Sequence, residues 1–206
     1  MAEKTLPVIT INREYGAGGR ALASVLSKEL DIPYYDADFV SKTMEESGFD
    51  KEDVEREGEE MSRPSQILND LLNGTVSYNS SHDAIFKAEK QVVLKLAENP
   101  CIMVGRCANH ILSEAGIDTV SIYLHAPADM RLKRTLELKE YGDMKPEKYM
   151  EERDSKRRTF YRYYTGRELT DASGYTFCFD VGKTGIPRCA QIILDMINNA
   201  DRSEGR

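Results

Sequence analysis

The sequence of 206 residues has no tryptophan, only three histidines and four cysteines, and no apolar run of the ~20 residues that a membrane span requires. The cysteines show no CxxC spacing, so reduced thiols are expected, and three scattered histidines argue against a zinc site. Residues 1–5 lead directly into an expected strand and do not resemble a signal peptide. These absences predict a cytoplasmic protein with no membrane association and no metal-binding side-chain cluster.

The composition, 40% hydrophobic and 31% charged, is typical of one globular domain over residues 1–206. The net charge of −7 is unevenly distributed. Residues 45–60 hold nine acidic side chains against Lys51 and Arg56, and residues 153–167 hold six basic ones against Asp154 alone. The acidic block is interpreted as a solvated face. The basic block suggests phosphate clamps, a solvated face or a nucleic-acid surface, although an acidic protein argues against a general nucleic-acid binder.

Short β-branched runs alternate with longer amphipathic segments along the chain. The pattern predicts strands over residues 8–11, 33–35, 101–105, 119–124 and 175–181. It predicts helices over residues 20–30, 82–98, 106–114, 128–139 and 146–164, and a closing helix that contains Cys189 and Ile197. Strands separated by helices imply an α/β fold with a parallel sheet, in which ligands bind beyond the carboxyl ends of the strands.

A glycine-rich loop follows the first expected strand. Its residues are Tyr15, Gly16, Ala17, Gly18, Gly19, Arg20 and Ala21. Strand, glycine loop and helix form a cradle for phosphate, because backbone N–H groups converge at the positive end of the helix. The loop lacks the first glycine, the lysine and the hydroxyl of the P-loop G-x-x-x-x-G-K-[ST]. The alternative is a turn that needs glycine only for steric reasons.

Other candidate side chains follow the expected strands. Arg20 could supply the missing cation or point to solvent. Arg106, after a buried strand and a glycine, could bind a phosphate or pair with a nearby carboxylate. Asp36 and Asp38 could bind an acceptor or a metal-bound water, and Asp38 also suits a helix N-cap.

The basic helix places Arg153, Asp154, Arg157 and Arg158 on one face, because residues three and four apart are neighbours. Asp154 can pair with Arg157 or Arg158. An exposed pair of this kind contributes only about 0.3–0.5 kcal/mol, so stability gives little reason for the concentration of charge. Arginines that grip phosphate oxygens are one explanation, and a solvated face is the other.

Four motifs taken together resemble the cytidylate kinase-like family, a divergent branch of the nucleoside monophosphate kinases. They are Ile9-Thr-Ile-Asn-Arg-Glu-Tyr-Gly-Ala-Gly-Gly-Arg20, Pro33-Tyr-Tyr-Asp36, Val104-Gly-Arg106, and Arg153-Asp-Ser-Lys-Arg-Arg-Thr-Phe-Tyr161. The resemblance runs from about residue 7 to residue 197. It implies a P-loop kinase-like three-layer sandwich with an acceptor-binding insertion at about 37–82 and a helical lid at about 134–165. It also implies transfer of a phosphoryl group from ATP, with Mg²⁺, to CMP or dCMP.

The resemblance assigns roles to particular residues. It matches Gly16, Gly18 and Gly19 to the phosphate loop, Asp36 and Arg106 to the acceptor site, and Asp154 and Arg157 to an Asp-x-x-Arg pair near the lid. Together with the candidates taken from the residues themselves, the loop from Tyr15 to Ala21 is expected to bind the donor phosphates, and the expected catalytic cations are Arg20, Arg153 and Arg157. The expected acceptor site contains Asp36, Asp38, Arg106, Asp154, Arg157 and Arg158. Arg131 and Arg134 would lie where a helix leads into the lid.

The sequence departs from the family pattern in four places. Gly19 stands in place of the P-loop lysine, and Ala21 does not restore the hydroxyl. Cys107 replaces an aspartate of the acceptor site, and Ala37-Asp38 replaces the small polar pair that follows Asp36. These departures leave two alternatives open: a kinase of another small phosphoryl acceptor, and a catalytically weak nucleotide-binding module with a regulatory role.

Overall fold

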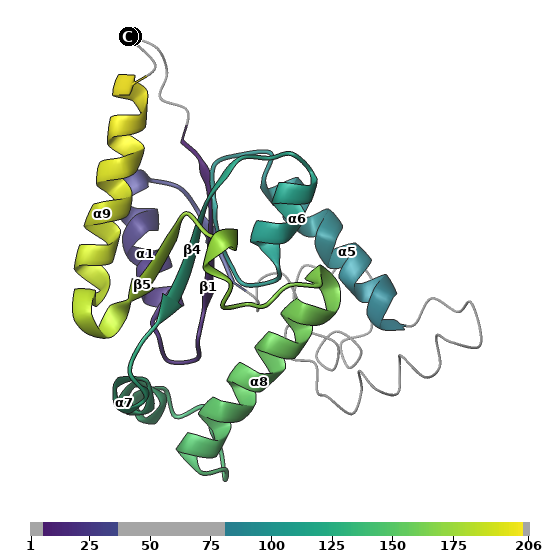
Figure 1. The fold of residues 1–206 in the computed structure, drawn as a ribbon, viewed down its shortest axis with the longest axis vertical. Helices are drawn as coiled ribbons and strands as arrows, with labels where there is room; N and C mark the ends of the chain where they lie inside the picture. The colour runs from purple at the N-terminus through teal and green to yellow at the C-terminus, as the bar shows by residue number, and fades with distance from the viewer. Residues whose placement is uncertain (1–5, 37–80, 204–206) are drawn as a thin grey trace.

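The computed structural model describes residues 6–36 and 81–203. The expected acceptor-binding insertion (37–82) lies almost wholly outside the described residues, as does Asp38. Figure 1 shows a central sheet with helices on both of its faces.

The sheet has five parallel strands in the order β2-β3-β1-β4-β5. Their bounds are Val8–Arg13 (β1), Tyr34–Tyr35 (β2), Ile102–Val104 (β3), Thr119–His125 (β4) and Phe177–Asp180 (β5). β1 lies at the centre, with Ile11 opposite Val104 on one side and Ile122 on the other. Its six residues are all buried, because helices cover both faces of a parallel sheet.

One face is covered by α1 (Gly19–Leu30) and α9 (Val181–Ser203), which contact each other. The apolar stripe expected on the closing helix is confirmed, since Cys189, Ile193 and Ile197 are buried in this layer. They pack with Leu22 and Leu26 of α1.

The other face is covered by α5 (Ser81–Leu96), α6 (Ala108–Glu114) and the second half of α8 (Pro146–Thr165). Phe160 of α8 is buried here and makes an edge-on contact with Phe86 of α5. α8 therefore anchors one end in the core, while its first half extends past the sheet (Figure 1).

The carboxyl ends of the strands share one edge of the sheet. α7 (Ala128–Leu138) lies beyond this edge, below the β1–α1 loop in Figure 1, and contacts α8. A 3₁₀ helix, η1 (Ala172–Gly174), precedes β5. The loop, Asp36, Arg106 and His125 follow or end neighbouring strands at this edge, as the parallel topology predicts.

The three-layer α/β fold with a parallel sheet is confirmed. The main difference is that β1 continues to Arg13, two residues beyond the expected end, because Asn12 and Arg13 stay in register with Tyr123 and Leu124 of β4. None of the described helices is long and apolar enough to cross a membrane. The lid at 134–165 corresponds to the end of α7, the connection and α8, and its role as a lid stays a prediction.

Candidate functional site

The β1–α1 loop bends through two glycines in the left-handed region. Gly16 has φ +76° and Gly18, the N-cap of α1, has φ +96°. A Cβ on Gly16 would lie 2.7 Å from the backbone oxygen of Arg131, and a Cβ on Gly18 would collide with the guanidinium of Arg134. The left-handed backbone therefore favours glycine at both positions, and the close approach of the α7 backbone requires it at Gly16 as well.

The loop's N–H groups divide into those that are hydrogen-bonded within the protein and those of the first turn of α1. The N–H of Ala17 donates to the oxygen of Glu14 at 3.2 Å, and that of Tyr15 donates to the carboxylate of Asp154 at 2.6 Å. The first helical hydrogen bond of α1 runs from Leu22 to the oxygen of Gly18, at 3.0 Å. The first turn of a helix has no intrahelical acceptor for its N–H groups, so the part of the cradle suited to phosphate begins at Gly18.

Arg131 of α7 joins the loop to α8. It donates to the Asp154 carboxylate and, at 3.2 Å, to the backbone oxygen of Tyr15, and its Nε lies 3.3 Å from Glu14 Oε2. The side chains of Asp154 and Arg131 are 7% and 12% exposed. Asp154 therefore pairs with Arg131 of α7, a partner that the spacing within its own helix did not suggest.

Two of the predicted site residues bind each other. Arg20, at the start of α1, donates from Nε to Asp36 Oδ2 at 2.8 Å, and its Nη1 lies 3.6 Å from Glu140. Glu140 in turn accepts a hydrogen bond of 2.6 Å from the hydroxyl of Tyr15. Arg20 thus bridges the β2 end and the α7–α8 connection, an arrangement that neither alternative from the sequence foresaw. Ala21, next to it, is exposed.

Aromatic rings position the arginines of α8. The guanidinium carbon of Arg157 lies 5.3 Å from the centre of the Tyr15 ring, and that of Arg153 lies 5.0 Å from the centre of the Tyr149 ring. The two tyrosine rings are perpendicular and meet edge to face, with their centres 5.4 Å apart. Burial and the hydrogen bond to Glu140 raise the pKa of Tyr15, so its ring stays neutral. Arg158, by contrast, is exposed.

Arg106 follows β3 with φ +58° and is buried. Its guanidinium forms an ion pair with Glu89 of α5, whose side chain is fully buried. Because Tyr35 of β2 lies opposite Met103 of β3, Asp36 and Arg106 leave neighbouring strands at the same edge. The structure thus brings Asp36, Arg106, Asp154, Arg157 and the loop to one edge of the sheet.

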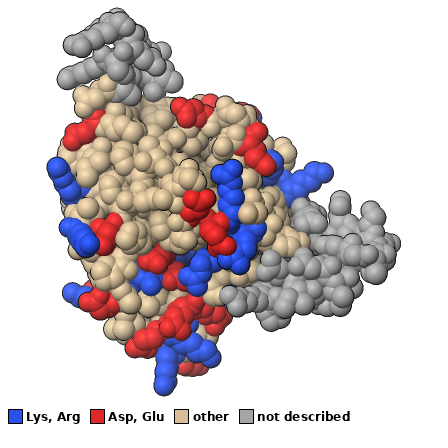
Figure 2. Space-filling view, in the orientation of Figure 1, with Lys and Arg blue, Asp and Glu red and all other residues tan. Residues whose placement is uncertain are grey.

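Three contacts around the loop were not predicted from the sequence, although Arg131 and Arg134 were expected near the lid. Arg131 pairs with Glu14, and Arg134 donates to the Gly16 oxygen at 3.4 Å. The third is Arg13, whose side chain lies against Gly19. The alternation of acidic and basic side chains continues on the surface over α7 and α8, at the lower edge of Figure 2.

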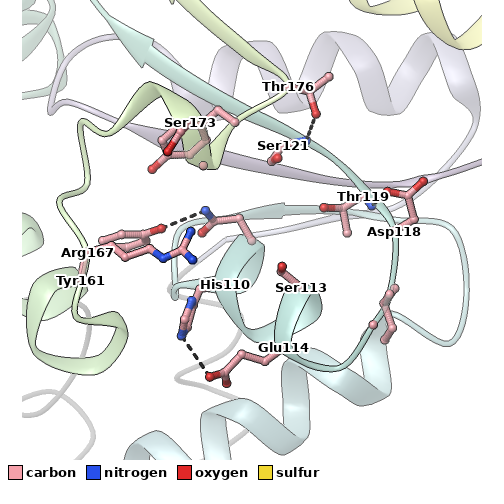
Figure 3. A pocket seen from close by; sticks show the side chains of 15 residues that line it. His110, Ser113, Glu114, Asp118, Thr119, Ser121, Tyr161, Arg167, Ser173 and Thr176 are labelled. Atoms are coloured by element: carbon pink, nitrogen blue, oxygen red, sulfur yellow. Dashed lines mark hydrogen bonds and ion pairs between the residues drawn. The ribbon is translucent and has the colours of Figure 1, made fainter.

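Apart from the sheet edge that carries the loop, the structure has a second hollow, of about 590 Å³, toward the amino end of β4. Its lining comes from α6, the start of β4, η1 and the end of α8, and includes His110, Ser113, Ser121, Tyr161 and Arg167 (Figure 3). None of the predicted site residues lines it.

Polar side chains connect the second hollow to β1. Asn109 accepts from Asn12 Nδ2 at 2.9 Å and donates to the hydroxyl of Tyr161 at 3.0 Å. Asn12 also donates to the hydroxyl of Tyr175 at 3.2 Å. This network fixes the strand end that carries Arg13.

Among the described residues, no group of three or more His, Cys, Asp or Glu side chains could hold a metal ion.

No curated protein matches the chain. The fold is similar to an uncharacterized protein from Eubacterium ventriosum (TM-score 0.67, 20% identity, 93% of this chain and 98% of the other). It is also similar to shikimate kinase from Acinetobacter baumannii in complex with shikimate (TM-score 0.54, 16% identity, 96% of each chain covered). A third similar structure is a gluconokinase from Sinorhizobium meliloti (TM-score 0.52, 10% identity, 98% of this chain and 97% of the other covered).

The Gly16→Ala variant tests the close packing of the loop against α7. In Gly16→Ala, the alanine must adopt the left-handed conformation and its Cβ meets the Arg131 backbone. In Gly142→Ala (φ +52°), no atom lies within 4 Å of the new Cβ. Both variants therefore place alanine in the strained left-handed region, but only the first also overpacks its surroundings. We expect Gly16→Ala to lower the free energy of unfolding by at least about 1 kcal/mol more than Gly142→Ala in urea denaturation. Equal losses would contradict the close approach.

His110 predicts a pH dependence of stability. Burial lowers the pKa of its imidazole more than the Glu114 carboxylate at 3.4 Å raises it, and Arg167 and Lys90 lower it further. The unfolded state therefore binds the proton more tightly, so stability falls as the pH drops through the unfolded pKa of about 6.5. We expect His110→Asn to lose less stability than the wild type between about pH 7.5 and 5.5, measured by thermal unfolding. Parallel curves would contradict this.

The model of the cytidylate kinase-like family matches residues 8–183, from β1 to the start of α9, and so covers the whole described site. The solved structures add that the fold is that of the P-loop kinases. The chain therefore belongs to the cytidylate kinase-like family.

Proposed function

We propose that the protein transfers the γ-phosphoryl group of ATP to a small acceptor, with CMP or dCMP as the first candidates. The observation that carries the proposal is the β1–α1 loop, in which left-handed glycines face the first turn of α1 under the arginines of α7. Phosphoryl transfer needs positioning and positive charge around the phosphates, and little covalent chemistry from the protein.

The fit of the donor nucleotide rests on the loop's geometry. Gly18 opens α1 without a side-chain cap, so the first-turn N–H groups suit phosphate oxygens. Arg134 lies directly over Gly18, and Arg157 is held beside the loop by the Tyr15 ring. These guanidinium groups would stabilise the charge on the transferring group while the acceptor oxygen bonds to phosphorus and the bond to the ADP oxygen breaks.

The described residues do not offer a preformed magnesium site. Arg20 stands at the motif's hydroxyl position, and Ala21 has no hydroxyl either. The carboxylates that contact the loop already have partners: Arg131 engages Glu14 and Asp154, Arg20 engages Asp36, and Tyr15 donates to Glu140. Mg²⁺ commonly binds through substrate phosphates, retained waters and one or two carboxylates. We therefore assign the ion to the phosphates of the nucleotide.

The acceptor would lie between the ends of β2 and β3, near Asp36 and Arg106. The family resemblance favours a nucleoside monophosphate. Against this, the chain has Cys107 at the position where that family has an acceptor-site aspartate. Arg106 is already paired with Glu89, so it would bind an acceptor phosphate only by sharing or exchanging that partner. Asp38 would take part from outside the described residues.

The acceptor is tested by ADP release from ATP and Mg²⁺ with a panel of CMP, dCMP, UMP, AMP, GMP, shikimate and gluconate. We expect release that depends on CMP or dCMP. Faster turnover with another acceptor would overturn the choice of acceptor alone. An unreactive ATP analogue that raises the melting temperature without any acceptor-dependent ADP release would favour a regulatory nucleotide-binding module, which the loss of the P-loop lysine motivates.

Arg157→Ala tests the role of α8. We expect kcat/KM to fall about 100-fold or more, because a transition-state contact is lost, while the free energy of unfolding changes by about 1 kcal/mol or less. Arg162→Ala is the matched control, because Arg162 lies on the same helix, is 58% exposed and pairs with Glu168. Unchanged kcat/KM in Arg157→Ala would remove this residue from the mechanism.

A further inference from the structure

Gly19 is a glycine for a reason different from that of Gly16 and Gly18. It is the first residue of α1 and does not adopt the left-handed conformation. A Cβ at this position would lie 3.1 Å from Cγ and 3.2 Å from Cδ of Arg13. The aliphatic part of Arg13 therefore crosses the space into which a side chain at position 19 would extend.

The two residues in this contact are two departures from the ordinary phosphate loop. In G-x-x-x-x-G-K-[ST], the first glycine corresponds to Arg13, the second to Gly18 and the lysine to Gly19. The residue with a cationic side chain and the residue without a side chain have thus exchanged positions. Because the Arg13 side chain passes over Gly19, the exchange brings a cation back to the neighbourhood from which the lysine is missing.

We propose that Arg13 provides the positive charge that a lysine provides in an ordinary phosphate loop, and that it contacts the donor phosphates directly. The inference rests on the proposed phosphotransferase function and deepens it. A guanidinium can take two phosphate oxygens in its planar fork, whereas an ammonium acts as a point charge. Arg13 would therefore supply the same positive charge as the lysine but bind the phosphate oxygens with a different geometry.

The surroundings of Arg13 suit this role. Arg13 ends β1, where it is paired in register with Leu124 of β4, so its backbone is fixed by the centre of the sheet. The residue is only 9% exposed. It lines the same cavity, of about 10 Å³, as Arg157 and Cys107, which places it beside the α8 arginine proposed to act on the phosphates.

An exchange of the two side chains tests the proposal. Arg13→Met removes the charge and keeps most of the stem, Arg13→Lys keeps the charge, and the double variant R13G/G19K restores the ordinary motif. Arg188→Met, an exposed position on α9, is the control. The measurements are the Kd for an unreactive ATP analogue with Mg²⁺, the kcat/KM for ATP, and the melting temperature.

We expect Arg13→Met to weaken analogue binding by roughly 10- to 100-fold, the effect of losing one charge-assisted contact, and Arg13→Lys to recover part of it. R13G/G19K should bind at least tenfold better than Arg13→Gly, because the new lysine has the space that Arg13 left. Gly19→Lys alone should bring no gain, since Arg13 occupies that space. Arg188→Met should behave as the wild type.

Several results would overturn the proposal. Arg13→Met with wild-type Kd and kcat/KM would do so, as would a folded R13G/G19K that binds no better than Arg13→Gly. In both cases the wild type binds the analogue, so the proposed function stands and only the role of Arg13 fails. A wild type that does not bind the analogue would overturn the proposed function, and this inference with it.

Discussion

The buried ion pair between Arg131 and Asp154 is the interaction on which the arrangement of the site depends. It links three segments that are distant in the sequence, because Asp154 also accepts from the Tyr15 N–H and Arg131 also binds the Tyr15 oxygen and Glu14. Removing one partner of a buried pair costs about 3–5 kcal/mol, since the other charge is left without compensation. α7 and the first half of α8 contribute little to the apolar core, so this pair, together with the glycines that allow α7 to approach, holds them against the loop.

The charges around the loop differ in how readily they can exchange partners. The Arg20–Asp36 pair is half-exposed on the arginine side and is worth at most about 1 kcal/mol, so an incoming phosphate can replace Asp36 at small cost. The Arg131–Asp154 pair is buried and is not replaced in this way. We therefore interpret Arg131 as part of the scaffold, and Arg20, together with Arg13, Arg134 and Arg157, as the groups that respond to the nucleotide.

The sequence predicted the fold well because hydrophobic periodicity and the spacing of strands and helices are local signals. It predicted the loop and the edge of the sheet for the same reason. It did not predict that Asp154 pairs with Arg131, because helical spacing relates Asp154 only to residues of its own helix, and Arg131 lies on another. For Arg106, one of the two predicted roles was an ion pair with a nearby carboxylate, but the sequence did not identify that carboxylate as Glu89. Arg13 was missed because the motif treats its position as a lost glycine, and only the packing against Gly19 shows a connection between the two departures.

In the proposed function, the loop before α1 binds the phosphates of a nucleotide through its backbone N–H groups. The most direct measurement is an NMR titration of the ¹⁵N-labelled protein with an unreactive ATP analogue and Mg²⁺. We expect the largest amide shifts at Gly18 to Ala21 and a smaller shift at Tyr15, whose N–H is bound to Asp154. Saturable shifts confined to the hollow around His110, with the loop amides unchanged, would contradict it.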